Sequence, residues 1–125
     1  MIDLDKFKSI NDRHGHAAGD RALIEMARVM NENMRSVDTL ARIGGEEFVA
    51  LLAEANLENA MKTAERIRVQ AARRPITYQD KEILLTISIG VAMLNIQDNS
   101  IEDVLHRADE ALYRAKQKGR NRVSS

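Results

Sequence analysis

The chain has 125 residues, 44% of them hydrophobic, and its 19 Lys and Arg residues balance its 19 Asp and Glu residues. This composition is typical of one globular domain, and the balanced charge gives no general argument for binding a nucleic acid polymer or a membrane. The absence of cysteine excludes disulfides and thiolate metal sites, and aromatic residues, at 3%, are too few to make base stacking an expected mode of binding. No apolar run reaches the ~20 residues that cross a bilayer and no signal peptide is visible, so we expect a cytoplasmic domain.

The first predicted element is a β-strand at the N-terminus. Residues 1–5 alternate apolar and acidic side chains, which places Asp3 and Asp5 on the same face of a strand. Phe7 and Ile10 then predict a short helical turn that ends near residues 11–15. Because nothing precedes this strand, we expect the chain to be truncated or to lack an N-terminal element.

An amphipathic helix and a β-hairpin follow. Residues 17–35 predict the helix, because apolar side chains recur there at three- and four-residue steps. Residues 36–43 and 47–53 predict two strands joined by a tight turn at Gly44 and Gly45, since glycine adopts positive φ without steric cost. The hairpin makes the sheet at least partly antiparallel.

The next segment predicts a helix and further strands. Asn56 is the expected N-cap of a helix that Pro75 ends, and residues 76–78 predict a short strand. Residues 82–95 carry apolar side chains at alternate positions, which predicts one long strand. Gly90 within this strand predicts a bulge or a close backbone contact.

A final helix with a basic end completes the chain. Ser100 is its expected N-cap and Gly119 its expected stop. Residues 106–125 contain six Lys or Arg residues and two acidic residues, so this end forms a local basic patch able to meet phosphate groups. The order of elements predicts an α+β fold, in which helices flank an antiparallel-containing central sheet of the ferredoxin-like, split-βαβ type.

Acidic residues gather at two predicted strand ends. Asp3 lies at the end of the first strand, while Glu46 and Glu47 directly follow two glycines whose bare backbone lets a ligand approach closely. If the two strands are neighbours, the carboxylates converge and require a cation between them, and Mg²⁺ combined with substrate phosphates suits such a site. The alternative, an ordinary Gly-Gly turn with surface acids that never meet, stays open on these residues alone.

Polar side chains around the loop at residues 14–19 suggest a site for a base. Asn11 offers a donor and an acceptor and Asp20 accepts only, so together they match a guanine edge. The residues alone favour the alternative, in which Asn11 is a helix C-cap and Asp20 is a first-turn acid. His14 and His16 have no third ligand nearby, so zinc is not expected.

Basic side chains elsewhere suggest phosphate contacts. Lys8, Lys116 and Arg120 are the candidates, although a solvated helix face is the usual explanation for any single lysine. Arg35 and Asp38 lie across a predicted helix-to-strand turn, where the alternative is a local ion pair worth under ~1 kcal/mol.

Taken together, these residues resemble the GGDEF-domain diguanylate cyclases over nearly the whole chain. The resemblance rests on ordered motifs at matching spacing: MIDLDKFK at 1–8, IND at 10–12, GH at 15–16, GD at 19–20, RIGGEEF at 42–48, SIGVA at 88–92 and several residues within 108–121. It implies a nucleotidyl-cyclase palm fold and condensation of two GTP molecules into cyclic di-GMP with release of two pyrophosphates. It also implies Mg²⁺, or Mn²⁺ in its place, and a second copy of the domain, because each domain holds one GTP and two domains face each other.

The resemblance further implies roles for single residues. Asp3, the Leu4 carbonyl and Glu46 resemble the metal ligands, and Glu46 and Glu47 resemble the catalytic acids. The residues that resemble the substrate contacts are Lys8, Asn11, His16, Asp20, Gly44, Gly45, Lys116 and Arg120.

A product-inhibition site is also implied by the resemblance. Arg35 and Asp38 match its RxxD pattern, since residues 39–43 separate them from the glycine pair, and Arg66 is a further basic contact. The opening helix and full first strand of the family are not found in these residues, and we expect no sensory or dimerising domain among them. We therefore expect a damaged sheet edge and reduced stability or substrate affinity.

Two other functions stay open. One is a non-catalytic module that binds cyclic di-GMP or GTP and signals to a partner, although the intact signature weighs against it. The other is a metal-dependent nucleotidyl transferase with a different substrate, which a comparison of ATP with GTP would test.

Overall fold

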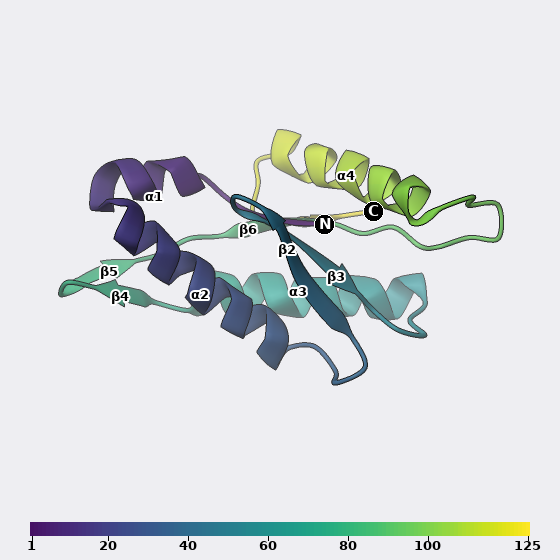
Figure 1. Cartoon of the computed structure of the whole chain (residues 1–125), viewed down its shortest axis with the longest axis horizontal. Coiled ribbons are helices and arrows are strands. Elements are labelled where there is room, and N and C mark those ends of the chain that lie inside the picture. The colour runs from purple at the N-terminus through teal and green to yellow at the C-terminus, as the bar shows by residue number, and fades with distance from the viewer.

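A mixed five-stranded sheet lies at the centre of the computed structural model, which describes residues 1–125 (Figure 1). The central strand is antiparallel to both of its neighbours, whereas the two strands at the far edge are parallel to each other. The strand order is β2-β3-β1-β6-β7, with bounds β1 Ile2–Leu4, β2 Thr39–Gly44, β3 Glu47–Leu51, β6 Ile87–Gly90 and β7 Val123–Ser124.

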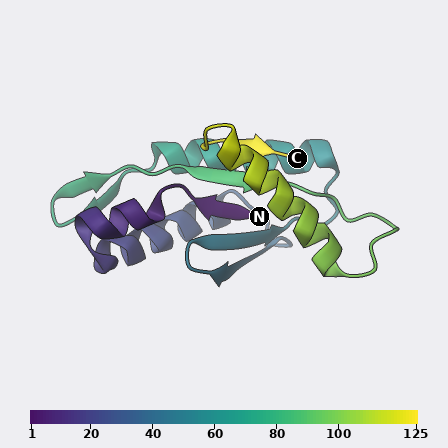
Figure 2. The same cartoon turned by 90° about the horizontal axis from the view of Figure 1, so that it is seen from above.

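Helices cover both faces of this sheet. α2 (His16–Glu32) and α3 (Leu57–Arg73) lie on one face and α4 (Ile101–Gln117) lies on the other, as the two views show (Figures 1 and 2). α1 (Phe7–His14) packs against α2, which ends earlier than predicted. The α+β fold predicted from the sequence is confirmed. None of the helices has the length and apolar character required to cross a membrane.

The side chains of β1 alternate between the two faces. Ile2 and Leu4, 2% and 1% exposed, belong to the core formed with α2 and α3. Asp3 and Asp5 are also buried, but they meet partners from α4 and from the loop that follows it. A buried carboxylate is costly unless it is paired or hydrogen-bonded, so these partners are a requirement of the fold.

Residues 82–95 do not form the single long strand that was predicted. β4 (Ile76–Tyr78), which was predicted, pairs with β5 (Lys81–Ile83) in a separate two-stranded hairpin. The chain joins the main sheet only at β6 and leaves it after Gly90. The alternate apolar residues from Ile83 to Ile89 are all buried across both strands and the segment between them, so the pattern alone does not distinguish one strand from two strands in different sheets.

The turn between β2 and β3 lies one residue later than predicted. Gly45 and Glu46 form the turn, and Gly44 pairs with Glu47 after a register shift that begins at Arg42. Gly45 has a φ of 36°, which is unfavourable for a residue with a side chain. The Arg42 Nε donates to the Gly45 carbonyl over 2.9 Å. Glu46 therefore sits within the turn, beside open backbone, and not on the strand.

The close backbone contact predicted at Gly90 is confirmed. A Cβ atom there would lie 2.1 Å from the carbonyl oxygen of Ala108 and 2.2 Å from the amide nitrogen of Leu112, both in α4. The predicted N-caps are also found. Asn56 accepts the expected backbone hydrogen bond at the start of α3, whereas the Ser100 side chain makes none at the start of α4.

The strand β7 was missed by sequence analysis, because two residues after a helix carry too little pattern. Val123 and Ser124 pair in parallel with Ile89 and Gly90. On its other side, Gly90 exchanges two backbone hydrogen bonds of 2.9 Å with Met1. Met1, directly before β1, and Ser124, at the end of β7, therefore flank the same residue of β6.

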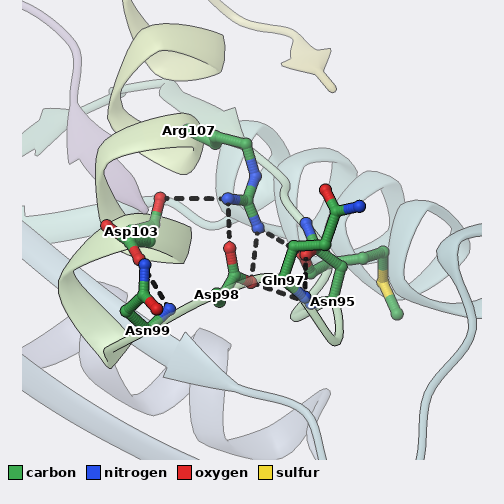
Figure 3. A network of polar contacts seen from close by, with 7 residues as sticks. Asn95, Gln97, Asp98, Asn99, Asp103 and Arg107 are labelled. Carbon is green, nitrogen blue, oxygen red and sulfur yellow. Dashed lines mark hydrogen bonds and ion pairs between the residues drawn. The ribbon is translucent and has the colours of Figure 1, made fainter.

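The loop between β6 and α4 is held by a network of polar contacts (Figure 3). Arg107 donates to both carboxylate oxygens of Asp98, at 2.6 and 2.8 Å, and to the carbonyl of Met93 at 2.7 Å. The hydrogen bonds from Arg107 and from the Asn95 backbone amide lower the pKa of Asp98 to about 2. The stabilisation from this ionised pair is lost as the pH falls through the interval between 3.8 and about 2.

Candidate functional site

The acids predicted to converge do lie at one end of the central strands. Asp3 of β1 stands directly across from Glu47 of β3, so their side chains share a face of the sheet. The Leu4 amide donates to the Glu46 carbonyl over 3.2 Å, which holds the turn against the end of β1. We call Asp3, Glu46 and Glu47 the acidic rim. That these carboxylates share one cation stays a prediction.

Burial and the neighbouring acids make the charge on Asp3 costly. Desolvation is the largest effect on its pKa and raises it, and Glu46 and Glu47 raise it further. The hydrogen bond and charge of Lys116 oppose this rise without cancelling it, so the pKa of Asp3 stays above its ordinary value. A cation that neutralises the rim would therefore be stabilising.

Lys116 already brings one positive charge to this place. Its Nζ lies 2.9 Å from a carboxylate oxygen of Asp3, and the Lys116 side chain is 31% exposed. The ammonium group of Lys116 shows that a positive charge is accommodated beside Asp3, which is consistent with a metal ion bound there by carboxylates. No group of three or more His, Cys, Asp or Glu side chains is arranged as a metal cage. A few carboxylates completed by substrate oxygens suit Mg²⁺ better than an ion held by protein alone.

The glycines of the turn leave room beside the rim. A Cβ atom added at Gly44 or at Gly45 would meet no atom within 4 Å, and both residues are exposed. The backbone here is open to a ligand, as predicted. This space lies at the same strand end as Asp3 and Lys116.

The packing of α1 on α2 places Asn11 against Gly19, the residue before Asp20. The Asn11 carboxamide lies against Gly19, where an added Cβ would be only 1.8 Å from Oδ1. That oxygen is buried and has no hydrogen-bond partner. Asp20, the next residue, is exposed in the first turns of α2, and His16 is exposed at its first position. An unpaired buried acceptor is costly, which indicates a role other than packing.

The remaining basic candidates occupy different positions. Lys8 is exposed on α1. Arg120 is exposed in the loop after α4, where its φ of 64° gives it the left-handed conformation. This loop follows Lys116 by one helical turn. Of the predicted basic patch, Lys116 contacts Asp3, whereas Arg107 pairs with Asp98 near the start of α4.

Arg35 and Asp38 form an internal ion pair with more contacts than the sequence suggested. Asp38 accepts from the Arg35 backbone amide at 2.8 Å, from its guanidinium at 3.1 Å and from the Ala53 amide at 3.0 Å. Burial opposes the charge on Asp38, but these hydrogen bonds outweigh it and its pKa lies below the ordinary value. Asp38 is 3% exposed, whereas Arg35 is 58% exposed. Arg66 donates to the Asn33 carbonyl over 2.7 Å, near the same loop.

Asp5 is a residue to which the sequence analysis assigned no role. Its carboxylate accepts from Thr86 Oγ1 at 2.6 Å, from Ser88 Oγ at 2.7 Å and from the Asn121 amide at 3.0 Å. The alternation of residues 1–5 placed it on the same face as Asp3, which was the available signal. The donors lie more than 80 positions away in the chain, and nothing local marks them.

Known proteins are similar to this chain over nearly its whole length. The family described as "Diguanylate cyclase, GGDEF domain" matches residues 1–122. Diguanylate cyclase A of Treponema denticola is 49% identical over 124 residues, which are 99% of this chain and 33% of that protein. The chain thus spans about a third of the length of this curated relative.

Solved structures give the same result. The active GGEEF domain of a diguanylate cyclase from Vibrio cholerae has a TM-score of 0.91 and 38% identity, over 98% of this chain and 78% of that one. The GGDEF domain of DgcB from Caulobacter crescentus, solved in complex with c-di-GMP, has a TM-score of 0.93 and 34% identity, over 98% of this chain and 73% of that one. The first of these carries the same two acids in its signature as residues 46 and 47 here.

Proposed function

Because this chain belongs to the GGDEF-domain family of diguanylate cyclases, we propose that it condenses two GTP molecules into cyclic di-GMP and two pyrophosphates. The observation that carries this proposal is the meeting of Asp3, Glu47 and Lys116 at one end of the central strands. Carboxylates and an ammonium group side by side provide the charges that a cation and a phosphate require.

The reaction requires positioning and charge neutralisation more than covalent help. The 3′-hydroxyl oxygen of one GTP attacks the α-phosphorus of the other, the bond to pyrophosphate breaks, and the step is repeated to close the ring. Asp3, the Leu4 carbonyl and Glu46 would hold Mg²⁺ or Mn²⁺, which would neutralise charge on the triphosphate. Glu47 would accept the proton of the attacking hydroxyl.

The other site residues would bind the substrate. Lys116, Arg120 and Lys8 would hold phosphate oxygens, with Gly44 and Gly45 leaving room for the triphosphate. The guanine would be read by Asn11 and Asp20, with His16 beside them, since the unpaired Oδ1 of Asn11 seeks a donor.

The reaction needs a second copy of the domain. The chain has one Gly-Gly-Glu-Glu signature and therefore one acidic rim, whereas the product joins two nucleotides. Each copy would hold one GTP, and two copies would face each other.

The test is incubation of the full chain with Mg²⁺ and GTP over a range of protein concentrations, with the product identified by mass spectrometry. We expect cyclic di-GMP, a rate that rises with the square of protein concentration when the protein is dilute, and no comparable reaction with ATP. The Asp80→Asn variant changes an exposed acid in the β4–β5 turn, outside the site, and serves as a control. No cyclic di-GMP at any protein concentration would contradict the proposal.

Arg35, Asp38 and Arg66 are proposed to form a product-inhibition site, in which Arg35 meets cyclic di-GMP and Asp38 holds Arg35 in place. This division is supported by the exposure of Arg35 and the burial of Asp38.

Arg35→Ala is expected to raise the half-inhibitory concentration of cyclic di-GMP about tenfold or more, because a charge-assisted contact is lost. Asp38→Asn is expected to lower the free energy of unfolding by about 1–3 kcal/mol, since two backbone amides and a guanidinium lose a charged acceptor.

Inhibition curves and urea denaturation measure the two effects separately. Arg35→Lys keeps the charge and removes the planar fork, so it should restore inhibition only in part. Equal effects of the Arg35 and Asp38 variants in both assays would refute the division of roles.

Gly19→Ala tests the proposed guanine contact without touching a charge. The new Cβ would displace the Asn11 carboxamide, which lies 1.8 Å from its position. We expect affinity for a non-hydrolysable GTP analogue to fall about tenfold and affinity for pyrophosphate, which has no base, to stay the same. Calorimetric titration measures both. Equal losses for the two ligands would argue against a base contact at Asn11.

A further inference from the structure

Asp5 is a buried carboxylate that the proposed reaction does not use. It is 6% exposed, and its three hydrogen bonds come from two hydroxyls of the β6 segment and from one backbone amide of the loop after α4. A carboxylate accepts hydrogen bonds and donates none, so all three partners must point at it. A buried carboxylate is costly unless hydrogen bonds satisfy it, and these three donors do so while joining three separate segments of the chain.

The loop that Asp5 holds is strained and carries Arg120. Arg120 and Asn121 both have positive φ, 64° and 46°, which residues with side chains rarely adopt. Such a conformation persists only where the surroundings enforce it. The Asn121 amide donates to Asp5, and the Asn121 side chain accepts from Arg68 over 2.7 Å.

The Arg68 contact ties the same loop to the opposite face of the sheet. Arg68 lies on α3 and forms a two-point ion pair with Glu65, at 2.6 and 2.9 Å. The loop is therefore held from β1 through Asp5 and from α3 through Arg68. Neither contact uses the Arg120 side chain, which stays exposed.

We propose that Asp5 is a positioning residue for the triphosphate, because its carboxylate fixes the loop at residues 119–122 and with it Arg120. The inference rests on the proposed function. Asp3 lies in β1 and Asp5 directly follows the strand, two residues along, so one short segment supplies the rim carboxylate and the anchor of the loop. The spacing between the acidic rim and Arg120 is thereby set by residues 3–5.

The principal test is Asp5→Asn, which keeps the shape and replaces one acceptor with a donor that opposes the Asn121 amide. We expect KM for GTP to rise about tenfold with kcat changed less than about threefold, since a ground-state phosphate contact is weakened. Binding of a non-hydrolysable GTP analogue should weaken by the same factor, and binding of guanosine should not change. Asp80→Asn makes the same chemical change at an exposed site and should alter neither quantity.

Hydrogen exchange gives a readout that does not depend on activity. The Asn121 amide should exchange faster in Asp5→Asn, while amides in the core of α2 keep their rates. If Asp5→Asn fails to fold, Ser88→Ala and Thr86→Val each remove one donor and should produce smaller changes of the same kind. A variant that loses stability but keeps the KM of the native chain would overturn the positioning role.

The two proposals fail in different ways. A native chain that forms no cyclic di-GMP contradicts the proposed function whatever Asp5 does. An active native chain whose Asp5→Asn variant binds the GTP analogue normally contradicts only the role of Asp5. Faster exchange at Asn121 together with weaker binding of the analogue supports it.

Discussion

Asp3→Asn is expected to lower the rate of cyclic di-GMP formation by about a thousandfold or more, the largest effect of any substitution on activity that we expect. The change removes a proposed metal ligand at the place where Glu47 and Lys116 also meet. Because Asn keeps the shape of Asp, the sheet should be undisturbed. Product formation by the native chain and the variant at equal protein concentration measures the effect.

The same substitution is expected to leave the stability of the free protein unchanged or to increase it slightly. The pKa of Asp3 is raised in the folded state, so the folded protein holds its proton more tightly than the unfolded chain does. Stability is therefore lost as the pH rises from the ordinary value of 3.8 through the raised pKa, and it stays lower above that interval. Asn carries no charge and avoids this cost, while Lys116 is exposed enough to be hydrated.

Activity and stability together give a sharp test of the acidic rim. Urea denaturation at neutral pH and at pH 3 should show that Asp3→Asn loses more stability on acidification than the native chain does. The variant lacks the gain that protonation of Asp3 provides, while Asp38 and Asp98 still lose their stabilisation. Asp80→Asn is again the matched control, and it should retain both activity and the native pH dependence. An Asp3→Asn chain that forms cyclic di-GMP at the native rate would remove the basis of the proposed mechanism.

Gly90→Ala is expected to have the largest effect on stability, a loss of about 3 kcal/mol or more in the free energy of unfolding. The added methyl group would lie 2.1 and 2.2 Å from backbone atoms of Ala108 and Leu112. Backbone atoms of a helix cannot move aside as a side chain does, so α4 must shift away from β6. Lys116 lies on that helix, and its 2.9 Å contact with Asp3 should lengthen as well.

Gly44→Ala is the matched control for this substitution. It is the same chemical change in the same sheet, but an added Cβ at Gly44 would meet no atom within 4 Å. Its effect on the free energy of unfolding should be below about 1 kcal/mol. Urea denaturation of both variants measures the difference in their free energies of unfolding. A Gly90→Ala variant no less stable than Gly44→Ala would mean that α4 does not rest on the β6 backbone.

The sequence predicted the elements whose signals are local. The alternation of residues 1–5 predicted β1, although the strand ends at Leu4 and Asp5 lies in the turn after it. Asn56 predicted the start of α3. Gly90 predicted a bulge or a close backbone contact, and the close contact with α4 is the one found.

What the sequence did not predict depends on partners distant in the chain. The ion pair between Asp3 and Lys116 joins residues near opposite ends of the sequence. The hydrogen bond from the Asn121 amide to Asp5 does the same. Residues 82–95 were assigned to one strand because periodicity reports burial and not which sheet provides it. The turn at Gly45 and Glu46 was placed one residue early, since two adjacent glycines satisfy either register.

The pairing of Met1 and Ser124 with the two sides of Gly90 has a mechanical consequence. β1 is antiparallel and β7 parallel to β6, so a tether attached at either end would leave the domain at the same side (Figure 1). A pull between the two tethers would act across the strands and separate their hydrogen bonds one after another. Such unzipping resists far less force than shearing along the strands, so tension between the ends would release β7 and β1 from β6 before it disturbed the helices.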